Sequence, residues 1–286
     1  MGSLSPTKLA DQISEFEPLD QVAKPLQRFI RTVLPGGSAQ RDLVSGRQLG
    51  HPLHPALTDV VIGSWGAALL LDLFGGSKRR AADPLIGIGV LAAAPTAVAG
   101  LADWSELQGR DRRFGMAHAL GNTSALLLFA SSWFLRARGR RASGVALSLA
   151  GTAVMSGSAW MGGHLSFSRG IGVNQNAFQT IPGTWQTLLK EEELEEGKLL
   201  PARVGDVDVL VVRHGADVHA MLDRCNHLGC QLSDGELRDD GIVCPCHGST
   251  FALDGTVVRG PATADQPTLE VRVEDGKVQA RRVRRR

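Results

Sequence analysis

The chain has 286 residues, of which 43% are hydrophobic and 21% are charged, with a formal net charge of +2. At ~100 to 200 residues per domain, this length predicts about two domains. The small net charge argues against a nucleic-acid binder, which normally carries a strongly basic face. Long uncharged runs lie between residues 55 and 168, whereas all four cysteines lie between residues 225 and 246. We therefore interpret the two parts separately.

The first 50 residues precede the uncharged runs. Apolar residues recur at helical spacing over residues 19–34, opposite Lys24, Arg28 and Arg31, which is typical of an amphipathic helix. Such a helix lies on a membrane surface or packs against a bundle. Residues 1–18 lack the apolar core of a cleavable signal peptide. We expect residues 1–50 to form an N-terminal interfacial region.

Residues 51–168 are expected to cross a membrane four times. Three uncharged runs, 84–102, 114–135 and 142–168, reach the ~18 to 20 residues that a bilayer requires. A fourth candidate, residues 55–75, carries aspartates only near its ends, where a charge costs less than at the bilayer centre. A soluble bundle is the alternative. Four tryptophans near the expected interfaces favour the membrane: Trp65, Trp104, Trp133 and Trp160.

The second part of the chain follows a linker, predicted at residues 169–183. Residues 184–286 contain short β-rich segments separated by Gly, Asp and Pro, which predict a small antiparallel β domain. Its basic C-terminal tail is expected to begin at Arg281. The predicted fold class is α+β multidomain, a four-helix transmembrane bundle followed by this β domain.

The strongest motif is RCNHLGC followed by CPCHGS. It supplies Cys225 and His227 from one loop and Cys244 and His247 from another. Zinc accepts such ligands, but zinc sites usually use separate Cys-x(2–4)-Cys and His-x(3–5)-His pairs. In a Rieske 2Fe-2S centre, two histidines replace two cysteines on one iron, so each loop can contribute one ligand of each kind.

The spacing Cys-x-His, sixteen residues, then Cys-x-x-His resembles the Rieske family over about residues 184–283. This resemblance implies a 2Fe-2S cluster. Cys225 and Cys244 would hold the inner iron, and His227 and His247 would hold the outer, solvent-facing iron.

The resemblance also implies roles for residues beside the ligands. In the high-potential branch, typified by cytochrome bc complexes, cysteines at the places of Cys230 and Cys246 form a disulfide between the cluster loops, although two unpaired buried thiols are the alternative. Ser249 matches a hydroxyl that bonds a cluster sulfide, whereas Phe251 replaces the tyrosine of that branch. Leu228 matches a segment that shields the cluster. The missing tyrosine argues against close functional identity with a bc-complex protein.

Four histidines accompany the predicted spans: His51, His54, His118 and His164. Alternating crossings bring all four to one membrane face. Gathered imidazoles suggest a b-type haem or a quinol pocket, because haem uses histidine as an axial ligand and quinol needs a proton acceptor. The alternative is that each histidine only caps a helix by hydrogen bonding.

The helical part resembles an uncharacterised family of small four-span membrane proteins. The resemblance rests on HP-x-HP at the first span and Gly-Leu-x-Asp-Trp after the second, and it implies architecture only. The loops on one side of the bundle carry seven Lys and Arg residues near the membrane, against six on the other. The positive-inside rule then predicts an integral protein of a bacterial-type cell membrane with its Rieske domain on the outer face.

We interpret the chain as a membrane-anchored carrier that exchanges single electrons between quinol or haem and a partner protein. The expected partners are that protein or quinol and membrane lipid, with no nucleic acid. A tethered Rieske ferredoxin of an oxygenase system and a redox-sensing membrane protein are the alternatives. A self-contained oxygenase would need a mononuclear iron site on a large catalytic domain, for which residues after 183 leave no room, and we predict no catalytic residue.

Overall fold

The computed structural model describes residues 5–283 and divides them into two compact units. The helical unit contains the described residues up to Pro35 together with Pro52–Gly170. The β unit contains Gly36–His51 and the described residues from Ile171 onward. The order of a helical part followed by a β part agrees with the predicted fold class. Residues 36–51, which the sequence groups with the N-terminal region, belong to the β unit.

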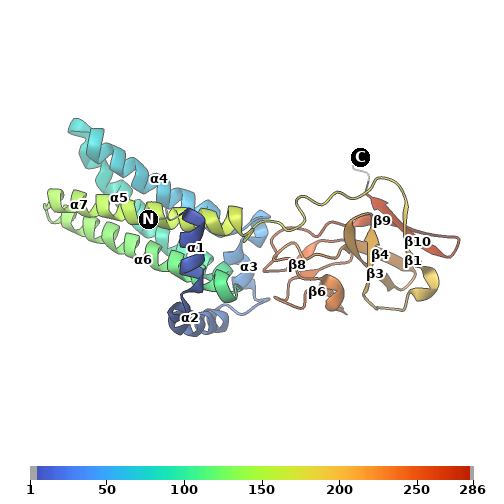
Figure 1. Cartoon of the computed structure of the whole chain (residues 1–286). Helices are drawn as coiled ribbons and strands as arrows, with labels where there is room; N and C mark the ends of the chain where they lie inside the picture. The colour runs from blue at the N-terminus through green and yellow to red at the C-terminus, as the bar shows by residue number, and fades with distance from the viewer. Residues whose placement is uncertain (1–4, 284–286) are drawn as a thin grey trace. The chain divides into compact units, whose positions relative to one another are not determined.

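Four long helices form the centre of the helical unit (Figure 1). They are α4 (Leu53–Phe74), α5 (Ala82–Trp104), α6 (Gly109–Ala137) and α7 (Arg141–Gly163). Helices α5 and α7 each pack against both α4 and α6, so α4 and α6 face each other diagonally across the bundle.

Three helical stretches in the described part of the chain are long and apolar enough to cross a membrane. They are Leu53–Phe74, Gly76–Trp104 and Arg141–Ser168. Helix α6 contains the predicted span 114–135 and is 29 residues long, but it is not among these three. Its uncharged stretch contains His118, Asn122 and several hydroxyl residues, which lower its mean hydropathy.

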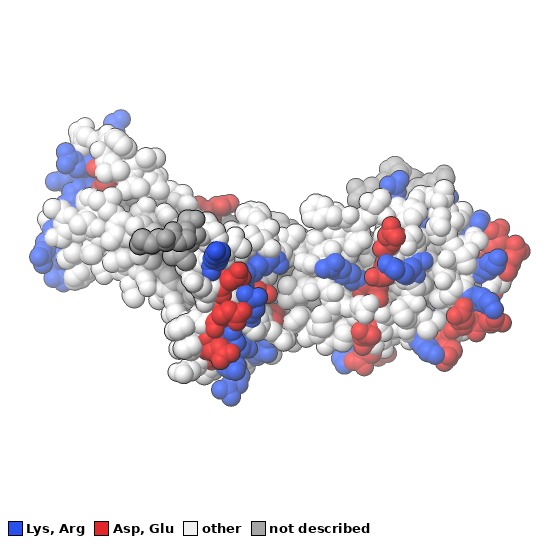
Figure 2. Space-filling view, in the orientation of Figure 1, with Lys and Arg blue, Asp and Glu red and all other residues white. Residues whose placement is uncertain are grey.

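Charged side chains mark the two ends of the helical unit. Figure 2 shows Lys and Arg gathered at the end where α4 turns into α5 and α6 into α7, and a largely uncharged surface between that end and the N-terminal helices. At the cationic end Arg136 of α6 donates to Asp72 of α4 and Asp83 of α5, each at 2.9 Å. Arg141 of α7 donates to the same two carboxylates at 2.7 Å. All four helices are therefore tied by one ionic network.

The N-terminal helices α1 (Pro6–Glu15) and α2 (Asp20–Val33) pack on the opposite end of the bundle. The Asp20 carboxylate accepts from Arg112 at 2.8 Å and from Arg113 at 3.2 Å. Of the two placements that amphipathicity allowed for this segment, the structure has it packed on the bundle.

The β unit contains ten short strands in three antiparallel sheets. The first sheet has the order β1 (Gln186–Lys190), β10 (Lys277–Arg282), β9 (Leu269–Glu274), and the second has β2 (Leu200–Val204), β3 (Val207–His214), β4 (Asp217–Leu222). The third has β5 (Glu236–Arg238), β6 (Gly241–Val243), β7 (Thr250–Phe251), β8 (Val257–Arg259). The short helix α3 (Ala39–Ser45) joins this unit.

The first two residues of the predicted basic tail, Arg281 and Arg282, belong to a strand. Arg281 lies in β10, where its guanidinium donates to the Glu270 carboxylate at 2.7 Å and stacks over the Trp185 ring. The end of the expected tail, residues 284–286, lies outside the described residues. Pairing within the sheet explains the difference, because the strand continues through Arg282.

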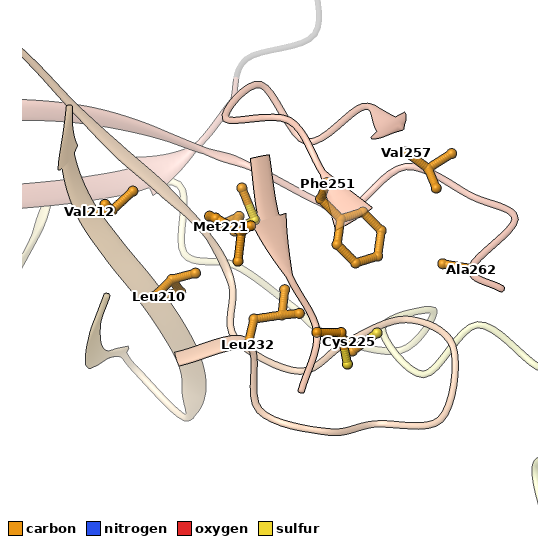
Figure 3. Packing of buried hydrophobic residues seen from close by; sticks show 10 residues of the cluster. Leu210, Val212, Met221, Cys225, Leu232, Phe251, Val257 and Ala262 are labelled. Atoms are coloured by element: carbon orange, nitrogen blue, oxygen red, sulfur yellow. The ribbon is translucent and has the colours of Figure 1, made fainter. Parts of the chain in front are cut away.

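One hydrophobic core lies directly behind the motif cysteines. Cys225, Cys244, Leu232, Phe251 and Ala262 belong to a single buried cluster. Figure 3 shows the Phe251 ring among these side chains, with Cys225 and Leu232 beside it. The third sheet and the loops that carry the motif are therefore anchored on the same apolar side chains.

Candidate metal centre

Two loops with the same backbone pattern carry the motif, and we call them loop 1 (residues 225–230) and loop 2 (residues 244–249). In loop 1 the Cys225 N–H donates to the Cys230 carbonyl at 2.8 Å, and the Gly229 N–H donates to the Cys225 carbonyl at 2.9 Å. In loop 2 the corresponding bonds join Cys244 with Ser249 at 2.8 Å and with Gly248 at 3.0 Å. Each loop thus closes on its first cysteine.

A glycine in each loop makes this turn possible. Gly229 and Gly248 have φ values of 83° and 76°, in the left-handed region that side chains with a Cβ rarely adopt. The glycine lies four residues after the first cysteine in both loops, so the sequences C-x-H-x-G and C-x-x-H-G specify the same turn. The histidine takes a different position in each loop.

The two loops bring the four predicted ligands together. The Cys225 thiol donates a hydrogen bond to the Cys244 sulfur. The rings of His227 and His247 meet edge to face, with centroids 5.1 Å apart and an interplanar angle of 85°. The site therefore has a thiol side and an imidazole side, as a cluster with two chemically different irons requires.

The two cysteine sulfurs share one proton, and their pKa values are shifted in opposite directions. Backbone N–H groups of Cys246 and His247 donate to the Cys244 sulfur, and together with the Cys225 thiol they lower the pKa of Cys244. The pKa of Cys225 is raised because its proton is held in that bond and because the thiol is buried. A metal would replace the shared proton, since thiolates are the metal-binding form.

On the imidazole side, His227 is held neutral. Burial, followed by the positive charges of His247 and Arg41, lowers the pKa of His227 to about 3. The Nδ1 atom of His227 is buried and has no hydrogen-bond partner among the described residues. A buried lone pair without a donor is costly, and an iron atom at this position would satisfy it. The donor set therefore fits a 2Fe-2S cluster.

The predicted disulfide joins the two loops. Cys230 and Cys246 are bonded, with 6.4 Å between their Cα atoms and a sequence separation of 16. Because Cys230 ends loop 1 and Cys246 lies within loop 2, the bond fixes the distance between the cysteine and histidine ligands of opposite loops.

Ser249 connects loop 2 to the turn at residues 260–262. Its buried hydroxyl oxygen accepts the backbone N–H of Ala262 at 3.0 Å, which leaves the hydroxyl hydrogen available to a cluster sulfide. Phe251 is fully buried behind the loops. Leu228 is half-buried in loop 1.

Sequence reasoning missed two residues that hold loop 1. The Gln266 amide donates to the Leu222 carbonyl at 2.6 Å and to the Arg224 carbonyl at 2.8 Å, and its oxygen accepts the Asn226 N–H at 3.2 Å. The Asn176 amide also donates to the Arg224 carbonyl, at 2.7 Å. Asn176 lies in the predicted linker, so this linker contributes to the site. No short sequence motif identifies these two amides, because their partners are far away in the sequence.

Sequence reasoning also missed Asp42 of α3, which contacts the turn at residues 260–262. The Asp42 carboxylate accepts the backbone N–H of Gly260 at 2.9 Å and is paired with Arg47 at 2.9 Å. Asp42 lies within residues 1–50, which sequence reasoning assigned to an N-terminal interfacial region.

The four histidines of the predicted spans have different surroundings. The rings of His54 and His118 lie next to each other in the helical unit and are perpendicular, with centroids 6.5 Å apart and an interplanar angle of 89°. His164 packs between the rings of Phe114 and Trp160. His51 belongs to the β unit.

Comparison with known families agrees with both parts of the chain. Residues 184–272 match the family described as "Rieske [2Fe-2S] domain". Residues 50–175 match the family described as "Predicted membrane protein (DUF2231)". The chain therefore carries a Rieske 2Fe-2S domain joined to a predicted membrane domain.

The curated relatives match the Rieske part. The cytochrome b6-f complex iron-sulfur subunit of Chlorobaculum tepidum is 40% identical over 26% of this chain and 40% of the relative. The cytochrome b6-f complex iron-sulfur subunit 3 of Nostoc sp. is 39% identical over 28% of this chain and 46% of the relative. This chain thus spans less than half the length of these two relatives. A solved complex of reduced oxygenase and oxidized ferredoxin in carbazole 1,9a-dioxygenase is 31% identical, with a TM-score of 0.33, over 35% of this chain and 94% of that chain.

Proposed function

We propose that this protein is a membrane-anchored Rieske electron carrier that moves single electrons between a membrane donor, quinol or haem, and a partner protein. The observation that carries the proposal is the paired loop geometry, in which two thiols and two imidazoles converge. A bound 2Fe-2S cluster would supply a one-electron couple. The similarity to cytochrome b6-f iron-sulfur subunits supports a role in electron transfer.

The protein's own residues prepare the site for that chemistry. Cys225 and Cys244 would hold one iron, with backbone N–H groups stabilising their thiolates. His227 and His247 would hold the other. The disulfide and the turns at Gly229 and Gly248 fix the loops. A rigid site suits electron transfer, because little rearrangement then accompanies the change of charge.

We propose that all four long helices span the membrane, α6 included. Residues 114–135 of α6 carry no charge, and the uncharged surface in Figure 2 covers the height of the bundle between its charged ends. We place the cationic end in the cytosol by the positive-inside rule. The N-terminal helices and the Rieske domain then belong on the outer face.

The proposed function is tested on the full chain purified anaerobically in detergent. We expect the EPR signal of a reduced Rieske centre, its loss in Cys244→Ser, and its retention in Cys246→Ser. A quinol added to proteoliposomes, followed by a soluble one-electron acceptor, should reduce and then reoxidise this signal. Zinc in place of iron, or a reduced cluster that no acceptor reoxidises, would contradict the proposal.

The orientation is tested by labelling single introduced cysteines in intact cells. Ser77→Cys lies on the cationic connection, and Gln108→Cys lies at the other end of the helical unit; both positions are exposed. An impermeant maleimide should label only Gln108→Cys. Labelling of Ser77→Cys alone would reverse the orientation, and labelling of both would contradict four spans.

A further inference from the structure

The two helical hairpins, α4–α5 and α6–α7, are built on one plan. Residues 89–100 of α5 and 151–162 of α7 share the pattern Gly-x(6)-[Thr/Ser]-Ala-x(2)-Gly, 62 positions apart. The first glycine faces an aromatic ring of its own hairpin in both copies: an added Cβ would lie within 3.0 Å of the Trp65 ring at Gly89 and of the Phe129 ring at Gly151. Helices also pack more extensively within each hairpin than between the two.

Equivalent positions of the two hairpins meet across the bundle. Three residues of α4 each contact the residue 64 positions later in α6. These pairs are the stacked rings of Trp65 and Phe129, the ion pair of Asp72 and Arg136, and the perpendicular imidazoles of His54 and His118. The two histidines are therefore the same position of a repeated unit.

Each hairpin holds its histidine in the same way. The His54 Nδ1–H donates to the Thr96 carbonyl at 2.9 Å, and the His118 Nδ1–H donates to the Ser158 carbonyl at 2.8 Å. Because a carbonyl only accepts, both Nδ1 atoms carry the proton and both Nε2 atoms keep a lone pair. The Asn122 amide lies 3.0 Å from the His118 Nε2 and can donate to that lone pair. A backbone carbonyl on the far nitrogen is the arrangement that orients metal-ligating histidines.

A glycine then fixes each ring against the neighbouring helix. A Cβ added to Gly100 would lie 2.7 Å from the His54 Nδ1, and one added to Gly162 would lie 3.0 Å from the His118 Cε1. Each imidazole therefore rests on a glycine one turn beyond the carbonyl that it bonds. A helix cap needs only a hydrogen bond. Here the carbonyl fixes which nitrogen carries the proton and the glycine fixes the position of the ring, and both features occur in each hairpin.

We propose that His54 and His118 are the axial ligands of a b-type haem bound between the two hairpins. Metal–nitrogen bonds to histidine are ~2.0 to 2.1 Å long, so imidazoles on opposite sides of one iron hold their ring centres about 6 Å apart. The observed separation is 6.5 Å. A tetrahedral ion such as zinc binds its ligands at about 109° and brings the rings closer. The His227 and His247 rings, which the Rieske fit assigns to a single iron, are 5.1 Å apart.

The site lies where helical bundles bind such cofactors, between side chains of facing helices. A porphyrin supplies four nitrogens of its own, so two axial histidines complete the iron. The proposed function requires an electron donor at the membrane, and this haem would be that donor. The role of the haem rests on the proposed function, whereas its binding to His54 and His118 does not.

The test uses the full chain, expressed with a haem precursor and purified in detergent. We expect a Soret band, one haem per chain in the pyridine haemochrome assay, and a low-spin ferric EPR signal. His54→Ala and His118→Ala should each lose the haem. His164→Ala is the matched control, because its ring packs in the same unit outside the pair, and it should keep the haem.

The Rieske EPR signal of every variant reports whether the chain has folded. If a histidine variant also loses that signal, His54→Gly supplemented with imidazole should recover low-spin haem. A protein that shows the Rieske signal but takes up no haem after titration with hemin would overturn the haem site and leave the proposed function intact. Haem retained in both histidine variants, or zinc held by the pair instead, would also overturn it.

Discussion

The Asp42 carboxylate accepts the backbone N–H of Gly260 across 218 positions of sequence, at 2.9 Å. Gly260 begins the turn whose Ala262 N–H donates to Ser249, and the Ser249 carbonyl in turn accepts the N–H of Cys244. Helix α3 is thus linked by three hydrogen bonds to a predicted cluster ligand. This link extends the candidate metal centre to residues that precede the first predicted span.

Replacing Asp42 by Ala should loosen the turn at residues 260–262. A lost hydrogen bond to a charged group costs ~1.5 to 3 kcal/mol, and Arg47 would lose its ion-pair partner. We expect faster hydrogen exchange at the Gly260 amide and earlier loss of the cluster on heating. Asp206→Asn, at an exposed position of the same unit, should change neither. Unaltered exchange at Gly260 in Asp42→Ala would refute the link.

Removing the disulfide should lower the stability of the two loops but leave the four cluster ligands in place. For a closed loop of about this size, chain entropy predicts ~3 kcal/mol. The double substitution of Cys230 and Cys246 by Ala should therefore keep the Rieske EPR signal but lose it at lower guanidinium concentration. A midpoint identical to that of the unaltered protein would mean that the bond contributes nothing to stability.

Ser249→Ala should lower the reduction potential of the cluster. Hydrogen bonds to cluster sulfurs favour the more negative, reduced state, and the Ser249 hydroxyl has its hydrogen available. Voltammetry of the full protein would measure the shift. An unchanged potential would show that this hydroxyl does not reach the cluster.

Phe251→Tyr should raise the potential if the added hydroxyl reaches a cluster ligand. The ring is fully buried in the same apolar cluster as Cys225 and Cys244. An unsatisfied hydroxyl there would cost ~1 to 3 kcal/mol, so a thermal scan distinguishes the outcomes. Lower stability without a shift in potential would mean that the hydroxyl found no partner.

Arg136→Met should destabilise the helical unit by ~3 to 5 kcal/mol, because it leaves the buried carboxylate of Asp72 without its main partner. Thermal unfolding in detergent would measure the loss. Lys78→Met removes an exposed cation from the same end and should have little effect. If both substitutions lowered the thermal stability equally, the cause would be the change in net charge and not the ion pair with Asp72.

The sequence was most informative where chemistry and local spacing coincide. Short β-rich segments predicted the β domain, and the mixed Cys and His spacing predicted the two ligand loops, because the ligand types lie within a few residues of each other. The resemblance to the Rieske family implied the disulfide. Asp42 and Gln266 could not be predicted, since each acts on backbone groups that only the fold brings near.

The pairing of His54 with His118 could have been predicted from a repeated pattern in the sequence. The two copies of Gly-x(6)-[Thr/Ser]-Ala-x(2)-Gly would have revealed the repeat, although few other positions of the copies match. Helix α6 was predicted as a span from its missing charges, but its polar residues keep it below the hydropathy of the other three helices.

The ion pair between Asp72 and Arg136 bears on how the two hairpins arose. If a single ancestral hairpin had paired with a second copy of itself, identical residues would have met at this buried position. Two aspartates there would repel each other at a cost that burial makes severe. With aspartate in one copy and arginine in the other, the first hairpin can no longer assemble with itself. The ion pair therefore makes each hairpin specific for the other, whereas the histidine pair is the same residue in both.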